Sequence, residues 1–207
     1  MGFNNITPVV KNLLIINVVL FLGADFIMGA FGLERTMLYM YYYTNSDFEE
    51  YQVITHMFMH GSFTHLFFNM FALFMFGPIL EMTWGPKRFL IYYFFTAFGA
   101  AILHTLVSYI ELNYLGNSNI EYSAVVGASG AVFGLLLGYG VYYPNNIVQL
   151  LIPPIPMKAK YFVMIFAGLE LFLGVSSFNT GIAHFAHLGG ALFGLIMIWY
   201  WRSSGKH

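Results

Sequence analysis

The sequence predicts an all-α polytopic membrane protein. Of its 207 residues, 59% are hydrophobic and only 8% are charged, whereas soluble domains carry charge on about a quarter of their residues. Six apolar runs approach the ~20 residues that a helix needs to cross a bilayer core. These runs cover residues 12–31, 65–83, 88–110, 126–143, 161–178 and 182–201. We therefore expect six membrane-spanning helices.

The connections between the runs support this division. Residues 32–64 form a long connection rich in tyrosine, a side chain that suits the headgroup region because one end of the ring can stay wet. The connection at 144–160 carries four prolines, whose fixed φ and missing N–H stop a helix. The fourth run must therefore end before them.

Composition excludes several classes of function. The chain has no cysteine, which removes disulfides, thiolate metal sites and cysteine nucleophiles. A net charge of -1 without a basic run provides no surface for nucleic acid. The first run lacks the charged start and the cleavage site of a signal peptide, so we expect it to be retained. The lipid bilayer is the expected environment, and nothing in the sequence specifies an oligomeric state.

The basic residues predict the orientation, because Lys and Arg accumulate on the cytoplasmic side of a membrane. With the N-terminus inside and six crossings, seven of the eight basic residues fall on the cytoplasmic side and only Arg35 falls outside. We therefore expect an integral, multi-pass protein with both termini in the cytoplasm. The expected location is a bacterial cytoplasmic (inner) membrane.

The stretch Gly127-Ala128-Ser129-Gly130 stands at the outer end of the fourth run. A serine framed by glycines can be approached closely by another group, which makes Ser129 a candidate nucleophile. The alternative is that these small residues serve helix packing, as they commonly do in membranes. The four-residue pattern alone does not separate the two interpretations.

His187 is the candidate base, because it lies near the outer end of the sixth run at a depth comparable to Ser129. Ionisable side chains within spans usually face the bundle interior and mark function or a polar pair. Small residues repeat every four positions on both helices, at Gly130, Gly134 and Gly138 and at Ala186, Gly190 and Gly194. If these two stripes face each other, the hydroxyl and the imidazole come within hydrogen-bond reach. A buried packing histidine is the alternative.

His65 and Asn69 stand four residues apart at the outer start of the second run, and so share a helix face. Both can present N–H donors to one point, as a developing oxyanion requires. The alternative is a polar cap on the outer connection.

Other polar residues receive structural interpretations. His56 and His60 fit a polar cap that anchors the outer connection. His104 fits a satisfied core or interface position, and Glu81 fits an inner-side acceptor for loop backbone amides. The sequence assigns no role to Glu170.

Three motifs resemble those of the rhomboid family of intramembrane serine proteases. In chain order they are His60-x4-His65-x3-Asn69, Gly127-x-Ser129-Gly130 and Ala186-His187-x2-Gly190-x3-Gly194. The resemblance covers nearly the whole chain, so we expect residues 1–207 to form a single rhomboid-like membrane domain. It implies a six-transmembrane-helix bundle with a long outer loop between helices 1 and 2.

The resemblance also implies the roles of the site residues. Ser129 would be the nucleophile and His187 the general base of a dyad that needs no cofactor or metal. Its substrates would be transmembrane proteins, cut near their outer ends. His65, Asn69 and the backbone N–H of Ser129 would form the oxyanion hole, and Phe133 would stack on the histidine. The motif residues Gly127, Gly130, Phe133, Gly190 and Gly194 would support the site.

Two points stay open at the level of sequence. Rhomboids often have Trp-Arg in the first outer loop, whereas this chain has Tyr51-Gln52, which leaves the anchoring of that loop undetermined. No carboxylate belongs to the centre by its position in the sequence, so nothing obvious fixes the tautomer of His187 as an aspartate does in a triad. Packing, by Phe133 for example, is then expected to orient the ring.

Two other functions compete with the dyad. A metal enzyme is suggested by histidines that include His60, His65, His184 and His187, but the chain lacks a His-Glu-x2-His run. The second is a catalytically inactive rhomboid-like protein that binds transmembrane clients. Inactive relatives are expected to lose the serine or the histidine, and this chain keeps both.

Overall fold

The computed structural model describes residues 6–149, 154–176 and 183–205. Within them, long helices occupy all six predicted segments: α1 Pro8–Ala30, α3 Phe63–Trp84, α4 Pro86–Tyr114, α5 Ser129–Tyr142, α6 Ala159–Val175 and α7 His184–Ser203. Of the described helices, α1, α3 and α4 are long and apolar enough to cross a membrane, and α5 is a shorter apolar helix. The predicted ends at 177–178 and at 182–183 fall partly outside the described residues.

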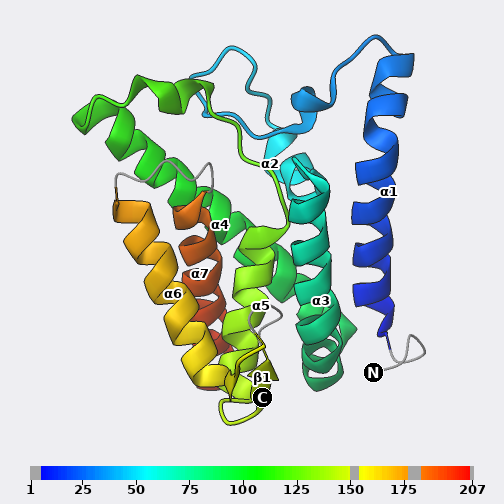
Figure 1. Cartoon of the computed structure of the whole chain (residues 1–207), viewed down its shortest axis with the longest axis vertical. Helices are drawn as coiled ribbons and strands as arrows, with labels where there is room; N and C mark the ends of the chain where they lie inside the picture. The colour runs from blue at the N-terminus through cyan, green and yellow to red at the C-terminus, as the bar shows by residue number, and fades with distance from the viewer. Residues whose placement is uncertain (1–5, 150–153, 177–182, 206–207) are drawn as a thin grey trace.

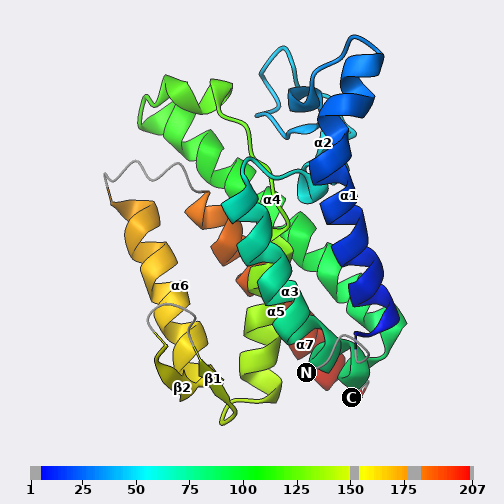
Figure 2. The same cartoon turned by 45° about the vertical axis from the view of Figure 1, so that its right-hand side comes forward.

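The helices form one bundle with two distinct ends (Figure 1). The start of α1, the α3–α4 junction and the end of α7 lie at one end, and the connection from α1 to α3 lies at the other. α4, α5 and α7 pack on one another at the centre. Figure 2 shows α1 and α6 on opposite flanks of this group. The start of α1 and the end of α7 therefore share one side of the bundle.

Short elements fill the connections. They are the 3-10 turns η2 Arg35–Leu38, η3 His56–Phe58 and η4 Ser118–Tyr122, the helical turn α2 Gln52–Thr55, and the strands β1 Ile147–Gln149 and β2 Pro156–Lys158. The two strands pair antiparallel, with Val148 opposite Met157. This hairpin was not predicted, because the prolines of the connection indicated only where the helix stops.

The start of α1 is fixed by Glu81 of α3. Its carboxylate accepts hydrogen bonds from the Thr7 hydroxyl, from the Val9 N–H at 3.1 Å and from the Val10 N–H at 2.9 Å. These first-turn amides have no partner within their own helix, and a carboxylate satisfies them while complementing the helix dipole. Glu81 is a structural acceptor for backbone amides, as expected, and its partners belong to the first turn of a helix.

α5 and α7 touch backbone to backbone at Gly130 and Gly190. A Cβ added to Gly190 would collide with the carbonyl oxygen of Gly130, and a Cβ added to Gly130 would collide with Ala100 of α4. Helices that carry side chains at their contact lie about 8–10 Å apart. Glycine at both positions removes this spacing, and the residues next to them are brought close together.

The two stripes touch backbone to backbone at this end of the helices. Further along, a Cβ on Gly134 would lie 2.5 Å from Thr96, and a Cβ on Gly194 would collide with the Tyr92 hydroxyl. Tyr92 and Thr96 belong to α4, and the Tyr92 hydroxyl donates to the Gly134 carbonyl at 2.8 Å. Side chains of α4 therefore occupy space beside the stripes at Gly134 and Gly194.

Alanine at Gly190 should destabilise the bundle, because the added methyl has no space against a backbone atom. Overpacking of this kind typically costs about 1–3 kcal/mol, more than the ~1 kcal/mol that alanine gains over glycine as a helix former. The matched control is Gly168→Ala on α6, where an added Cβ meets nothing within 4 Å. Thermal unfolding in detergent should show a lower Tm for Gly190→Ala and an unchanged or higher Tm for Gly168→Ala. Equal Tm values would contradict the contact.

Candidate active site

A cavity of about 830 Å³ opens between α3, α4, α5, α6 and α7. His65 and Asn69 of α3, Ser129 of α5 and His187 of α7 all line it, and Phe133 and Gly127 do so as well. The cavity falls within the range of about 300–1,000 Å³ that is usual for ligand sites. His65 and His187, more than 120 positions apart in the chain, thus line the same cavity.

Ser129 is the first residue of α5, and Gly127 shapes the approach to it. Gly127 has φ +121°, a backbone angle that residues other than glycine rarely adopt. A Cβ at this position would lie 2.7 Å from Nε2 of His65 and 3.7 Å from Oγ of Ser129. The glycine therefore leaves open a point that both the imidazole and the hydroxyl face.

The segment before Ser129 is held by backbone bonds to the α1–α3 connection. Met40 and Val125 form an isolated antiparallel bridge, with N–H···O distances of 3.1 and 2.8 Å. The Gly127 N–H donates to the carbonyl of His56 at 2.9 Å. Figure 1 shows this segment descending from the end that holds the connection into the bundle, so that α5 begins in its interior.

Gln52 ties the connection together. Its side-chain amide donates to the carbonyls of Met37, at 3.1 Å, and Asp47, at 2.7 Å, and its Oε1 accepts from the Tyr41 N–H at 3.3 Å. The residue is fully buried, so these bonds are shielded from water. Gln52 thus anchors the connection at the place where the Tyr51-Gln52 departure left anchoring open.

His187 is oriented by two neighbours. The ring of Phe133 stacks on it with centroids 4.3 Å apart and an interplanar angle of 5°, the arrangement that the resemblance implied. Oε1 of Glu170 lies 3.0 Å from Nδ1 of His187. The N–H direction does not point at this oxygen, so the contact is a close ion-pair distance without an aligned hydrogen bond.

The residues next to Ser129 and His187 in the sequence lie close to each other. A Cβ on Gly130 would be 3.9 Å from the carbonyl oxygen of Ala186, so the residue after the serine and the residue before the histidine are in contact distance.

Glu170 is a site residue that sequence reasoning missed. Its second oxygen lies 2.6 Å from Nδ1 of His184, and the ligand atoms of Glu170, His184 and His187 all lie within 4.8 Å of one another. The available signal was a single carboxylate in an otherwise apolar helix, which marks function or a polar pair. Its partners were not evident because they belong to the next helix.

Asn69 and His65 occupy the wall opposite α7. Asn69 is 5% exposed, and its Nδ2 donates to the His65 carbonyl at 2.9 Å. One amide hydrogen is used in this bond, and the second is left for another acceptor. The His65 ring also meets the His60 ring edge-on, with centroids 5.1 Å apart.

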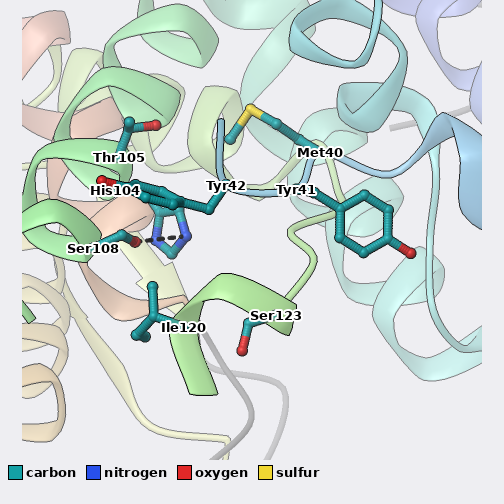
Figure 3. A pocket seen from close by; sticks show the side chains of 8 residues that line it. All are labelled: Met40, Tyr41, Tyr42, His104, Thr105, Ser108, Ile120 and Ser123. Carbon is teal, nitrogen blue, oxygen red and sulfur yellow. Dashed lines mark hydrogen bonds between the residues drawn. The ribbon is translucent and has the colours of Figure 1, made fainter. Parts of the chain in front are cut away.

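A second serine–histidine pair lies in a separate pocket (Figure 3). The Ser108 hydroxyl is 3.5 Å from Nε2 of His104, and Tyr42 lies over the histidine while the Tyr41 ring points away. The cavity beside them measures about 10 Å³, room for about one water molecule. A peptide cannot enter it, so this pair is structural, as expected for His104.

The comparisons with known proteins agree with this fold. Residues 47–204 match the rhomboid domain, and the chain belongs to the rhomboid family. It is an integral membrane protein of that family, with the apolar helices described above.

Individual relatives are moderately similar. The Bacillus subtilis (strain 168) protein YdcA is 30% identical over 197 residues, which cover 94% of this chain and 89% of the relative. The rhomboid protease GlpG of Haemophilus influenzae is 27% identical, with 80% and 78% covered. The rhomboid protease AarA of Providencia stuartii is 29% identical over 68% of this chain, and the match spans about half of the relative, 52%.

Two buried histidines predict an acid-sensitive fold. His56 and His60 of the connection are 4% and 1% exposed, and burial lowers the pKa of each to about 4. The unfolded chain, with a histidine pKa of about 6.5, then binds more protons below that pH. Stability is fully present above pH ~6.5 and is lost as the pH falls toward 4.

The contribution of His60 can be separated by substitution. Tm in detergent should fall from pH 7 to pH 5 in the parent, and fall less in His60→Phe, which keeps a buried ring without a titrating group. His56 should account for part of the fall in Tm between pH 7 and pH 5 that remains in His60→Phe. Parallel Tm–pH curves for the two proteins would show that His60 does not titrate with unfolding.

Proposed function

We propose that this protein is an intramembrane serine endopeptidase that cleaves transmembrane segments of membrane proteins near their outer ends. Membership of the rhomboid family, which includes named proteases, supports the protease class. The observation that carries the proposal is the common cavity of Ser129 and His187, in which Phe133 stacks on the histidine. A nucleophile and an oriented base beside one substrate-sized space are what nucleophilic catalysis requires.

The reaction follows from these positions. Oγ of Ser129 attacks the scissile carbonyl while His187 takes its proton, and the histidine then gives that proton to the leaving amine. The tetrahedral oxyanion accepts hydrogen bonds from the Ser129 backbone N–H, His65 and Asn69. Water enters the same cavity and hydrolyses the acyl-enzyme.

The membrane arrangement belongs to the proposal. The whole chain, 1–207, forms one domain that crosses a bacterial cytoplasmic membrane six times, with both termini in the cytoplasm. The shared side of the two chain ends and the seven-to-one distribution of basic residues support it. A substrate helix must unwind locally, because bare backbone is tolerated at membrane depth only where protein or water satisfies it. Helix-breaking substrates with small residues at the cut are expected.

The alternative is an inactive rhomboid-like protein that binds transmembrane clients through the same cavity. It differs from the protease in one observable property, the reactivity of Ser129. A serine-directed fluorophosphonate labels an activated serine and leaves an inert one untouched.

Substitution of either dyad member should abolish cleavage of a reporter transmembrane substrate. Ser129→Ala and His187→Ala should each remove activity while the protein stays folded in detergent. The double variant should be no worse than the single ones, since the two residues act as a unit. Fluorophosphonate labelling should vanish in Ser129→Ala. Full turnover by either single variant would exclude the dyad.

The oxyanion donors should affect turnover more than binding. Loss of one donor from a dry site costs about 100- to 1,000-fold in kcat, and a cavity open to water should soften this loss. Asn69→Ala and His65→Ala should therefore each lower kcat by roughly 10- to 100-fold with little change in KM. If Asn69→Ala only lowers Tm and the folded fraction turns over normally, Asn69 is a structural residue and the hole lies elsewhere.

The topology can be tested with single cysteines, because the chain has none of its own. A cysteine at Asn45 in the outer connection should react with an impermeant thiol reagent in intact cells. A cysteine at Lys206 should react only after the membrane is opened. The reverse pattern would place the cavity on the cytoplasmic side.

A further inference from the structure

Glu170 lies between two histidines of the neighbouring helix. It belongs to α6, and Figure 1 shows α6 alongside α7, with which it is in contact. His184 and His187 are three residues apart and therefore share a face of α7. Their Nδ1 atoms lie 2.6 Å and 3.0 Å from the two oxygens of the Glu170 carboxylate. The side chains are 13%, 6% and 11% exposed for Glu170, His184 and His187.

We propose that Glu170 is a positioning residue of the active site, which sets the tautomer and stabilises the charge of His187. This inference rests on the proposed protease function. The site would then comprise Ser129, His187 and Glu170 in series, with His184 holding the far oxygen of the carboxylate.

The tautomer follows from hydrogen-bonding capacity. An ionised carboxylate only accepts hydrogen bonds, so the histidine nitrogen beside it is the one that carries the proton. With Nδ1 protonated, Nε2 of His187 is left as the acceptor for the Ser129 proton. In the opposite tautomer, two lone pairs would meet at Nδ1 and the base would be on the wrong nitrogen. The carboxylate therefore selects the productive form.

Charge stabilisation is the second contribution. When His187 takes the serine proton it becomes an imidazolium, and a carboxylate at 3.0 Å favours that cation strongly in a poorly solvated site. Oε1 lies off the N–H direction at rest, and catalytic hydrogen bonds are often loose until the substrate binds. The Nδ1 proton stays on His187 throughout, and Glu170 stays ionised.

His184 explains how the carboxylate is aimed. Its Nδ1 bonds Oε2 at 2.6 Å, which fixes the plane of the carboxylate and directs Oε1 to His187. Glu170 is the only acidic residue of α6, and an ionisable residue in a membrane helix is retained at a cost. Two histidine partners offset this cost while placing the charge next to the base.

The test is Glu170→Gln, which keeps the size of the side chain and removes its charge. Since general-base catalysis contributes about 100- to 10,000-fold, we expect kcat to fall by roughly 10- to 100-fold, with little change in KM. Glu170→Asp should recover part of the loss. The matched control is Glu50→Gln, which removes the same charge from an exposed site in the outer connection and should leave kcat unchanged.

The pH profile separates positioning from a purely structural role. The titratable groups facing His187 in the described structure are Glu170 of α6, His65 of α3 and His184 on α7 itself. Removal of the carboxylate should move the acidic limb of the kcat/KM profile, which reports protonation of His187, to lower pH. A structural clamp between α6 and α7 would instead lower Tm and leave both the profile and the kcat of the folded fraction unchanged.

Two further outcomes decide between this inference and its rivals. If EDTA abolished wild-type cleavage and Zn²⁺ restored it, the three residues would be metal ligands and the positioning role would be overturned. Ser129 could react with fluorophosphonate at the same rate in the wild-type protein and in the Glu170→Gln protein. That result would exclude the positioning role of Glu170 and leave the protease function standing. Absence of labelling in the wild type would instead contradict the protease function itself.

Discussion

The backbone contact between α5 and α7 is the constraint on which the site depends. Gly130 follows Ser129 directly, and Gly190 stands about one turn after His187. The collision that a Cβ on Gly190 would make with the Gly130 carbonyl means that any side chain at this point moves the two helices apart. Since a displacement of about 1 Å can cost roughly 100-fold in rate, the glycines matter to chemistry as well as to packing. They fix the separation of the proposed nucleophile and base without contributing a reactive atom.

The surrounding structure brings polar groups into an apolar bundle and gives several of them hydrogen-bond partners, while both ring nitrogens of buried His60 have none among the described residues. The α1–α3 connection, held by buried Gln52, bonds through His56 to Gly127 and so controls where α5 begins. Glu170 is another polar group with partners inside the bundle, because its carboxylate faces His184 and His187. A dry bilayer offers no water to replace these partners, so the bonded polar groups depend on partners within the protein.

Much of the architecture could be predicted from the sequence, because each apolar run that crosses a membrane must satisfy its own backbone as a helix. Ser129, His187, His65 and Asn69 were identifiable since polar residues inside such runs are rare, and all four line one cavity. Glu170 could not be assigned to the site, because its contact with His187 depends on how α6 is rotated against α7. For the same reason the sequence could not reveal that Thr96 and Tyr92 lie beside the stripes of α5 and α7. The anchoring by Gln52 depends on the path of an irregular connection, which leaves no periodic pattern.

The most direct test of the account is an experimental structure of the protein after reaction with a fluorophosphonate. The phosphorus should be bonded to Oγ of Ser129, and a phosphonyl oxygen should lie within hydrogen-bond distance of the Ser129 N–H and of Asn69 or His65. His187 should remain stacked on Phe133 with its Nε2 toward the adduct and its Nδ1 toward Glu170. An adduct on another serine, or a phosphonyl oxygen that points away from α3, would contradict the assignment of the catalytic centre.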